Sequence, residues 1–119
     1  DYFANGLPKA DVFVVPTGSG VCLSGIVNCL HHAGLNCRVV GVCTRSVVSV
    51  RRVVERYCTT ALCAGFAVDL MSGEKTSPMP FPGHVFWEGQ AWGWLTANIK
   101  SLPKRVCFIN LGRHDDQQN

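Results

Sequence analysis

Charged side chains are scarce in this sequence of 119 residues, of which only 16% are Asp, Glu, Lys or Arg whereas 47% are hydrophobic. This composition argues against intrinsic disorder and is typical of a globular domain with a sizeable core. The net charge of +3 is too modest, and the arginines are too little interleaved with aromatic residues, to indicate nucleic-acid binding. We therefore expect a single globular domain over residues 1–119 and no nucleic-acid partner.

Long apolar runs are also missing. The longest uncharged stretch, residues 12–37, is interrupted by Pro16, by glycines and by polar residues, so we expect no membrane span. The chain opens without a basic segment followed by an apolar one, which predicts no signal peptide. It also opens without Met, from which we expect a mature, trimmed or excised piece.

No Cys-x-x-Cys pair occurs, although the sequence holds seven cysteines. Most of them lie within apolar runs, where a reduced thiol packs as a small hydrophobic group. We therefore expect a cytoplasmic or other reducing compartment. We expect no metal site, because His31 and His32 are adjacent rather than spaced as zinc ligands are, and they fit the negative end of a helix instead. Cys22, near a predicted helix start, is the one cysteine whose position suggests reactivity, and a packed thiol is the favoured interpretation.

The sequence does contain an alternation of strand-like and helix-like segments. Apolar runs and apolar residues at helical spacing predict strands at 12–15, 38–43 and 106–111 and helices at 20–32, from Ser46 onward and at 88–101. Residues 58–70 fit either a further helical turn or a buried crossover, and residues 84–87 fit either a short strand or a loop. This order indicates an α/β fold with three layers (αβα), in which a mostly parallel sheet of three to four strands is covered by about three helices.

Three segments are expected to lie outside these elements: an entry segment at 1–11, a surface loop at 72–83 and a polar tail at 113–119. Helical spacing predicts two further apolar helix faces, made by Val47, Val50, Val54 and Tyr57, and by Ala91, Trp94, Leu95 and Ile99. Gly25 within the first helix costs about 1 kcal/mol relative to Ala. We expect this glycine to allow close packing of the helix on the sheet.

The pattern most suggestive of function is the loop Thr17-Gly18-Ser19-Gly20 between the first predicted strand and helix. Such a loop directs several backbone N–H groups outward at the positive end of a helix dipole, where an anion such as phosphate can bind. It is not a Walker A loop, a dinucleotide fingerprint or a nucleophile elbow, since the residues that these motifs require are absent. A generic phosphate loop and a plain tight turn without a ligand both remain open.

The segment from Lys9 to Gly20, followed by Ser24-Gly25-Ile26, resembles a part of the fold-type II pyridoxal-phosphate enzymes, the tryptophan synthase β-subunit-like family. In that family a strand delivers a glycine-rich loop to the cofactor phosphate. Residues 38–42 resemble the family's next strand, 87–91 its penultimate stretch and 106–113 its closing strand and turn, whereas 46–86 match poorly. The resemblance covers the C-terminal part of the cofactor domain.

This resemblance implies that Thr17 to Gly20 hold the phosphate of pyridoxal phosphate, through their backbone and the hydroxyls of Thr17 and Ser19. It also implies that the turn from Asn110 to Gly112 lies beside the pyridine ring, and that a parent enzyme is a lyase or deaminase. Two departures from the family pattern stand against activity. Leu111 replaces the expected hydroxyl or thiol residue. None of the lysines of this chain, Lys9, Lys75, Lys100 and Lys104, stands in the sequence context of the family's Schiff-base lysine.

We therefore expect a reduced or partial relative without catalytic residues, which is inactive alone but binds a phosphate-bearing small molecule. The alternative is a non-enzymatic α/β domain with a phosphate ligand or a protein partner. A small sheet leaves an edge and a face unpaired, so we expect self-association, or a partner, through an exposed apolar surface. Trp92 lies off the buried helix face and is a candidate contact. His114, Asp115 and Asp116 fit a solvated tail better than a hydrolytic or metal site.

Overall fold

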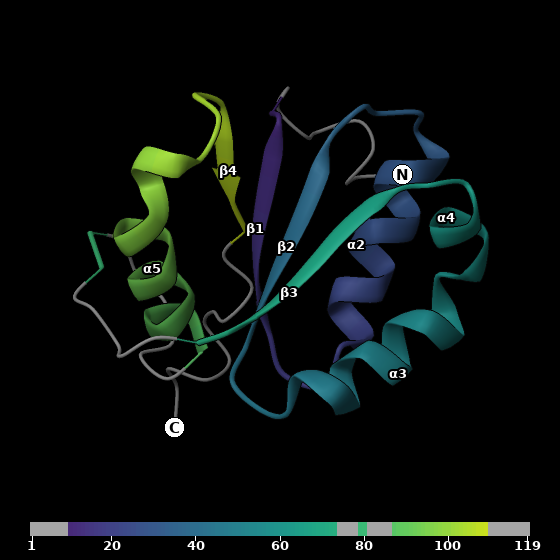
Figure 1. The fold of residues 1–119 in the computed structure, drawn as a ribbon, viewed down its shortest axis with the longest axis horizontal. Coiled ribbons are helices and arrows are strands. Elements are labelled where there is room, and N and C mark those ends of the chain that lie inside the picture. Colours follow the sequence, from purple (N-terminus) through teal and green to yellow (C-terminus); the bar gives the residue numbers. More distant parts are fainter. Residues whose placement is uncertain (1–9, 74–78, 81–86, 110–119) are drawn as a thin grey trace.

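The computed structural model describes residues 10–73, 79–80 and 87–109. In this part of the chain, four parallel strands form one sheet and four α-helices connect them (Figure 1). The elements are β1 (Val12–Thr17), α2 (Val21–His32), β2 (Arg38–Cys43), α3 (Val47–Tyr57), α4 (Thr59–Cys63), β3 (Ala67–Ser72), α5 (Trp87–Asn98), the 3-10 turn η1 (Ile99–Ser101) and β4 (Val106–Phe108). The predicted α/β class and three-layer arrangement are confirmed.

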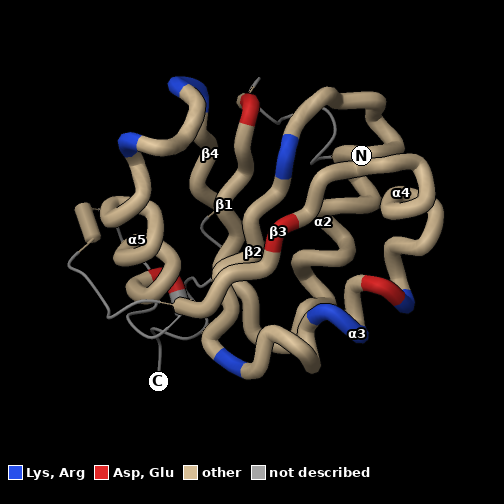
Figure 2. The backbone as a smooth tube through the Cα atoms, in the orientation of Figure 1, with Lys and Arg blue, Asp and Glu red and all other residues tan. Residues whose placement is uncertain are grey.

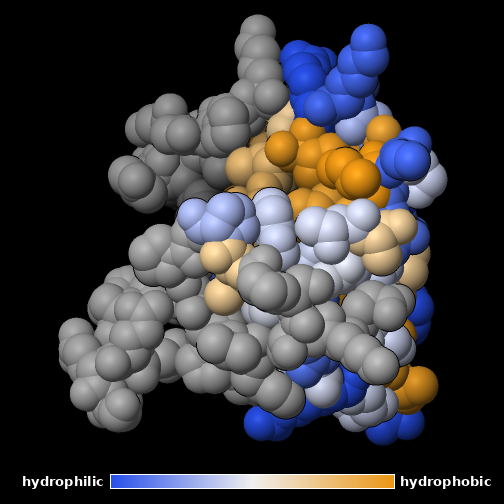
Figure 3. All heavy atoms as spheres, turned by 90° about the vertical axis from the view of Figure 1, so that its left-hand side faces the viewer, coloured by the Kyte–Doolittle hydropathy of each residue, from blue (hydrophilic) through white to orange (hydrophobic). Residues whose placement is uncertain are grey.

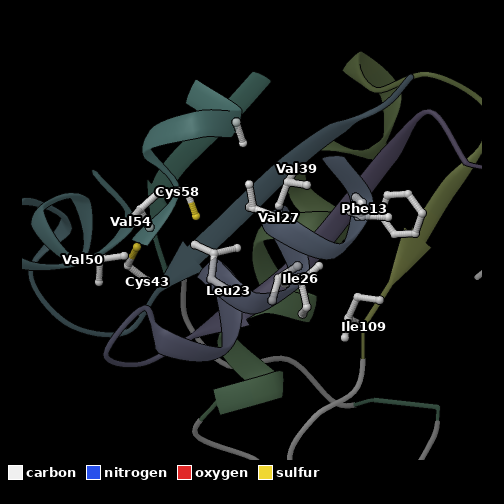
Figure 4. Close-up of a cluster of buried hydrophobic side chains, with 13 residues drawn as sticks. Phe13, Leu23, Ile26, Val27, Val39, Cys43, Val50, Val54, Cys58 and Ile109 are labelled. Carbon is white, nitrogen blue, oxygen red and sulfur yellow. The ribbon is translucent and has the colours of Figure 1, made fainter. Parts of the chain in front are cut away.

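Helices α2, α3 and α4 cover one face of the sheet and α5 covers the other (Figure 1). Strand β1 shows why both faces are covered, because successive side chains of a strand point to opposite sides. Phe13 and Val15 belong to the first apolar cluster, together with Leu23 of α2 (Figure 4). Val14 belongs to the second cluster, together with Ala91 of α5. Within the described residues, no helix is both long and apolar enough to cross a bilayer.

The strand order is β3-β2-β1-β4, with every neighbouring pair parallel. From the central β1 the chain moves through β2 to β3 on one side, and it returns to β4 on the other side of β1. The helix that follows β1 and the helix that precedes β4 lie on opposite faces of the sheet, so the winding of the chain reverses between β1 and β4. Such a switch point is where open α/β sheets bind ligands, and doubly wound dinucleotide-binding sheets share this order for their first four strands.

The second helix begins as predicted. Ser46 is the N-cap of α3, and its hydroxyl oxygen accepts a hydrogen bond from the Ser49 amide at 3.3 Å. Val50 and Val54 are buried, as their spacing predicts. The prediction is wrong for Tyr57, whose side chain is 56% exposed. Tyr57 is the last residue of α3 and projects past the core, with the Arg56 guanidinium 6.0 Å from its ring.

The undecided segment 58–70 contains the helical turn α4 and the start of a strand, β3, that the sequence pattern did not predict. This strand lies at the edge of the sheet and none of its residues is fully buried. It also contains a charged residue, Asp69, which pairs with Arg38 of β2 at 2.7 Å. An edge strand with a charged residue lacks the continuous apolar run that marks buried parallel strands.

The predicted helix 88–101 is α5 followed by η1. The side-chain amide of Asn98 donates to the Trp94 carbonyl at 2.8 Å where α5 ends, and the chain then tightens into the 3-10 turn. Because of this change, Ile99 leaves the apolar face and is 46% exposed, contrary to its helical spacing, whereas Leu95 is buried as predicted. Trp87 begins α5 rather than ending a strand.

Most of the expected entry segment, most of the expected surface loop and the polar tail lie outside the described residues, as do residues 84–86 and 110–111 of the predicted short strand and last strand. Strand β4 accordingly spans Val106–Phe108. Ile109, just beyond it, still donates a hydrogen bond to the Val14 carbonyl at 2.9 Å. The end of β4 is thus held beside Val14, within β1.

The packing role expected for Gly25 is wrong. Gly25 is exposed, and a Cβ built on it would meet nothing within 4 Å. The close approach of helix and sheet occurs instead at Gly41 of β2, where a Cβ would lie 2.7 Å from Cδ2 of Leu23, 3.0 Å from Oγ1 of Thr17 and 3.1 Å from Cδ2 of Leu70. A glycine in the strand, rather than in the helix, therefore makes room for α2.

Candidate phosphate-binding site

The loop Thr17–Gly20 connects the carboxyl end of β1 to the first turn of α2, as the sequence predicts. Gly20 is the N-cap of α2 and has a φ of 103°, a left-handed conformation that favours glycine. A Cβ on Gly20 would lie 3.3 Å from side-chain atoms of Val50 and Val53, so the loop packs against α3. The strand order places this loop at the central strand β1, next to the switch point of the sheet.

Two carbonyl groups of the loop are engaged by neighbouring donors. The Thr17 carbonyl accepts from the Thr44 amide at 3.1 Å and from the Thr44 hydroxyl at 3.4 Å. The Gly20 carbonyl accepts from the Ser24 amide at 2.9 Å and from the Ser24 hydroxyl at 2.7 Å. These bonds hold the Thr17 and Gly20 carbonyl oxygens within the protein.

The amides of the loop and of the first turn of α2 are the hydrogen-bond donors of the candidate site. The Val21 amide makes one long hydrogen bond, at 3.4 Å, to the Ser19 hydroxyl oxygen. No acceptor among residues 10–73, 79–80 and 87–109 is found for the amides of Gly18, Ser19, Gly20, Cys22 and Leu23. Free amides at a helix start, reinforced by the positive end of the helix dipole, suit an anion.

The two hydroxyls assigned to the phosphate lie in different surroundings. The Thr17 side chain is 2% exposed, and its hydroxyl donates to the Val15 carbonyl at 2.9 Å on the side of the sheet that α2 covers. The Ser19 side chain is exposed. Of the pair, Ser19 alone is therefore at the surface, and Thr17 would contribute to the loop through its backbone.

The structure adds an acidic residue that sequence reasoning missed. Glu88 in the first turn of α5 is only 1% exposed. Because α5 leads into a parallel strand, its first turn lies where the strands end, at the red segment at the start of α5 in Figure 2. There Gln90 packs beside Gly73 and the Cys43 carbonyl.

Glu88 stands one helical turn before Ala91, which packs on Val14 of β1. Its carboxyl group is therefore on the sheet-facing side of α5, toward the end of β1 from which the loop departs. Glu88 takes part in an interaction within the protein. The helical spacing of Glu88 with Ala91 and Leu95 was the signal in the sequence, since it places a charge on an apolar face.

The remaining predicted site residues are divided between the described and the undescribed parts of the chain. Asn110 and Gly112, expected beside the pyridine ring, lie outside the described residues, as do Lys9 and Lys75. Lys100 in η1 and Lys104 in the turn before β4 are exposed and lie at the amino end of β4. That end of the sheet is opposite the loop, so neither lysine is placed to react at it.

The thiols are of two kinds. Cys22, in the first turn of α2, is exposed, so its interpretation as a packed thiol is wrong. Cys43 and Cys58 are buried, and burial raises the pKa of both thiols. None of the seven cysteines forms a disulfide bond. The expectation that cysteines pack as small hydrophobic groups therefore holds for Cys43 and Cys58 but not for Cys22.

The candidate contact residue Trp92 packs within the molecule. Its ring meets that of Phe108 edge to face, with centroids 5.4 Å apart and planes at 88°, and it is half-buried. The side of the molecule formed by α5, η1 and β4 nevertheless carries an apolar patch bordered by hydrophilic residues (Figure 3). Self-association or partner binding through an apolar surface stays a prediction.

Comparison of the chain with family models, with curated proteins and with solved structures found no match. Within the described part of the chain, no three His, Cys, Asp or Glu side chains are grouped so that they could hold a metal ion. The loop from Thr17 to Leu23 and the nearby Glu88 are therefore the basis for a functional proposal.

Proposed function

We propose that this chain is a reduced or partial relative of fold-type II pyridoxal-phosphate proteins and binds a phosphate-bearing small molecule, with pyridoxal phosphate as the favoured ligand. The phosphate would lie at the start of α2, on the amides of Gly18 to Leu23 and the Ser19 hydroxyl. The observation that carries this proposal is the set of backbone amides without acceptors in the loop and the first turn of α2. These amides lack acceptors in the described chain while the Thr17 and Gly20 carbonyls are bound.

The donor set fits a phosphate group well. Several backbone N–H groups can together bind an oxyanion, and the helix dipole adds favourable charge. The alternative is a plain tight turn without a ligand. Such a turn does not need five unpaired amides next to a switch point of the sheet. The resemblance of residues 9–26 to the cofactor loop of the family points to the same ligand.

Glu88 supports a ligand that carries a nitrogen donor as well as a phosphate. A pyridinium nitrogen is stabilised by a carboxylate partner, and Glu88 supplies a buried carboxylate on the other side of β1 from α2. A carboxylate has two oxygens and can accept several hydrogen bonds.

The chain by itself is proposed to bind rather than to catalyse. Bound pyridoxal phosphate supplies an electron sink, but its chemistry on amino acids needs a lysine that holds it covalently. The described lysines, Lys100 and Lys104, lie at the opposite end of the sheet from the loop. A parent enzyme of the lyase or deaminase type would supply such a lysine elsewhere.

Calorimetric titration with pyridoxal phosphate and with inorganic phosphate tests the proposal. Ser19→Asp places a negative charge at the exposed loop residue and should lower the affinity for both ligands by at least about tenfold, through charge repulsion at short range. Ser101→Asp makes the same change in charge on an exposed residue of η1, at the far end of the sheet, and is the matched control. Equal affinities of the two variants would refute the loop as the site.

A second variant separates the ring from the phosphate. Glu88→Gln should weaken binding of pyridoxal phosphate by about tenfold, because a charge-assisted hydrogen bond is lost, and should leave inorganic phosphate unaffected. A thermal-shift panel with nucleotides completes the test. Stabilisation by nucleotides instead of pyridoxal phosphate would redirect the assignment, and stabilisation by no phosphate compound would favour the alternative of a protein-interaction domain.

A further inference from the structure

We propose that Thr44 is a positioning residue of the phosphate loop, which fixes the direction of the Gly18 amide from the neighbouring strand. This inference rests on the proposed function, because it concerns the affinity of that same loop. Thr44 follows β2 and is half-buried, and nothing in its sequence surroundings marks it as part of a binding site.

The first step of the argument is the register of the strands. Thr17, the last residue of β1, is paired with Cys43, the last residue of β2. Thr44 therefore stands where the ladder would continue if both strands were one residue longer. It extends the ladder with two donors to one acceptor, since both its amide, at 3.1 Å, and its hydroxyl, at 3.4 Å, bond to the Thr17 carbonyl.

The second step is the planarity of the peptide bond. The Thr17 carbonyl points toward β2, where Thr44 holds it. In a trans peptide the N–H of the next residue points the opposite way, and the described residues contain no cis peptide bond. The Gly18 N–H is therefore directed away from β2, toward the side of β1 on which β4 lies.

That side is the switch point of the sheet, where β4 ends at Phe108 in register with Val14. The Gly18 amide is thus the donor of the loop that is directed toward the β4 side of β1. Gly18 has no side chain that could restrain its own orientation, so the restraint has to come from its neighbours. Thr44 provides it from a different strand.

Thr44→Val removes the hydroxyl with little change in shape and keeps the amide bond to Thr17. We expect about threefold weaker binding of pyridoxal phosphate, because the hydroxyl bond is the longer of the two. Thr44→Ser retains the hydroxyl and should bind within about twofold of the unchanged chain. Thr59→Val is the matched control. The hydroxyl of Thr59, the first residue of α4, donates to the carbonyl of Glu55 in α3 at 2.9 Å, and its loss should leave affinity unchanged.

Affinity is measured by calorimetry for pyridoxal phosphate and for phosphate-free pyridoxal, together with the melting temperature of each variant. A positioning role predicts that Thr44→Val weakens only the phosphate-bearing ligand, whereas a structural role would lower the melting temperature and affect Thr44→Ser as well. Unchanged affinity of Thr44→Val, with normal binding by the unchanged chain, would overturn this inference alone. Failure of the unchanged chain to bind either compound would overturn the proposed function and this inference together.

Discussion

At the scale of single residues, burial decides which polar and reactive groups are available. Thr17 and Ser19 belong to the same loop, yet the Thr17 hydroxyl bonds to Val15 inside the sheet and the Ser19 side chain is exposed. The resemblance to the family's cofactor loop implies both as ligands, and the residue pattern does not separate them because alternation along a strand cannot be read where the strand ends. Whether the Thr17 side chain lies inside the sheet depends on whether β1 stops at Val15 or continues to Thr17. In the structure the strand continues to Thr17.

Burial also makes the stability of the chain depend on pH. It raises the pKa of the Cys37, Cys43, Cys58 and Cys107 thiols above the ordinary value of 9.0. Above that pH the unfolded chain loses thiol protons that the folded chain keeps, so the free energy of unfolding falls as the pH rises from 9. Below the unfolded-state pKa both states hold the protons, and this contribution to stability is fully present.

Urea denaturation under reducing conditions at pH 7.5, 9 and 10 measures this dependence. We expect the free energy of unfolding to decrease between the last two pH values, and Cys43→Val to reduce that decrease, because the valine cannot ionise. A free energy of unfolding that rises above pH 9, or a Cys43→Val variant with an unchanged slope, would show that the buried thiols do not govern it.

At the scale of elements, the packing role that the sequence suggests for one glycine belongs to another. Gly25 interrupts a helix and looks like a packing site, but it faces solvent. Gly41 lies in an apolar strand, where no sequence pattern distinguishes it, and it is the residue that gives Leu23 room against the sheet. The sequence cannot distinguish these cases, because close approach depends on how α2 lies across the sheet and not on the local spacing of residues.

Matched glycine-to-alanine variants test this assignment by urea denaturation. Gly25→Ala should raise the free energy of unfolding by about 1 kcal/mol, since it improves helix propensity and meets no neighbour. Gly41→Ala should lower it by about 1–3 kcal/mol, because the new methyl group overpacks the contact with Leu23, Thr17 and Leu70. Destabilisation by Gly25→Ala, or tolerance of Gly41→Ala, would contradict the packing described here.

At the scale of the whole molecule, the sequence is sufficient for the fold class and insufficient for the sheet. The apolar runs of β1 and β2 and the helical spacing of α2 predict a βαβ unit, because fully buried parallel strands leave a clear signal. The edge strand β3, interrupted by Asp69, leaves none. Strand order is set by long-range pairing, and it is this order that puts the loop after β1 at a switch point.

The candidate site, like the fold, could be predicted from the sequence only in part. Its loop is local and could be predicted from residues 12–20, whereas Glu88 and Thr44 join it only through the topology of the sheet. The side chain of Thr44 reaches the Thr17 carbonyl because two parallel strands end in register. No spacing in the sequence contains that information, since the two residues are joined across strands rather than along one helix.

The central claim is that the amides from Gly18 to Leu23 bind a phosphate group. Nuclear magnetic resonance of the ¹⁵N-labelled chain, titrated with pyridoxal phosphate and then with inorganic phosphate, observes these amides one by one. We predict saturable shifts of the amide signals of Gly18 to Leu23 with both compounds, and of residues in the first turn of α5 with pyridoxal phosphate alone. Amides of this loop that remain unmoved while either ligand binds elsewhere, or that remain unmoved at saturating ligand, would contradict the account.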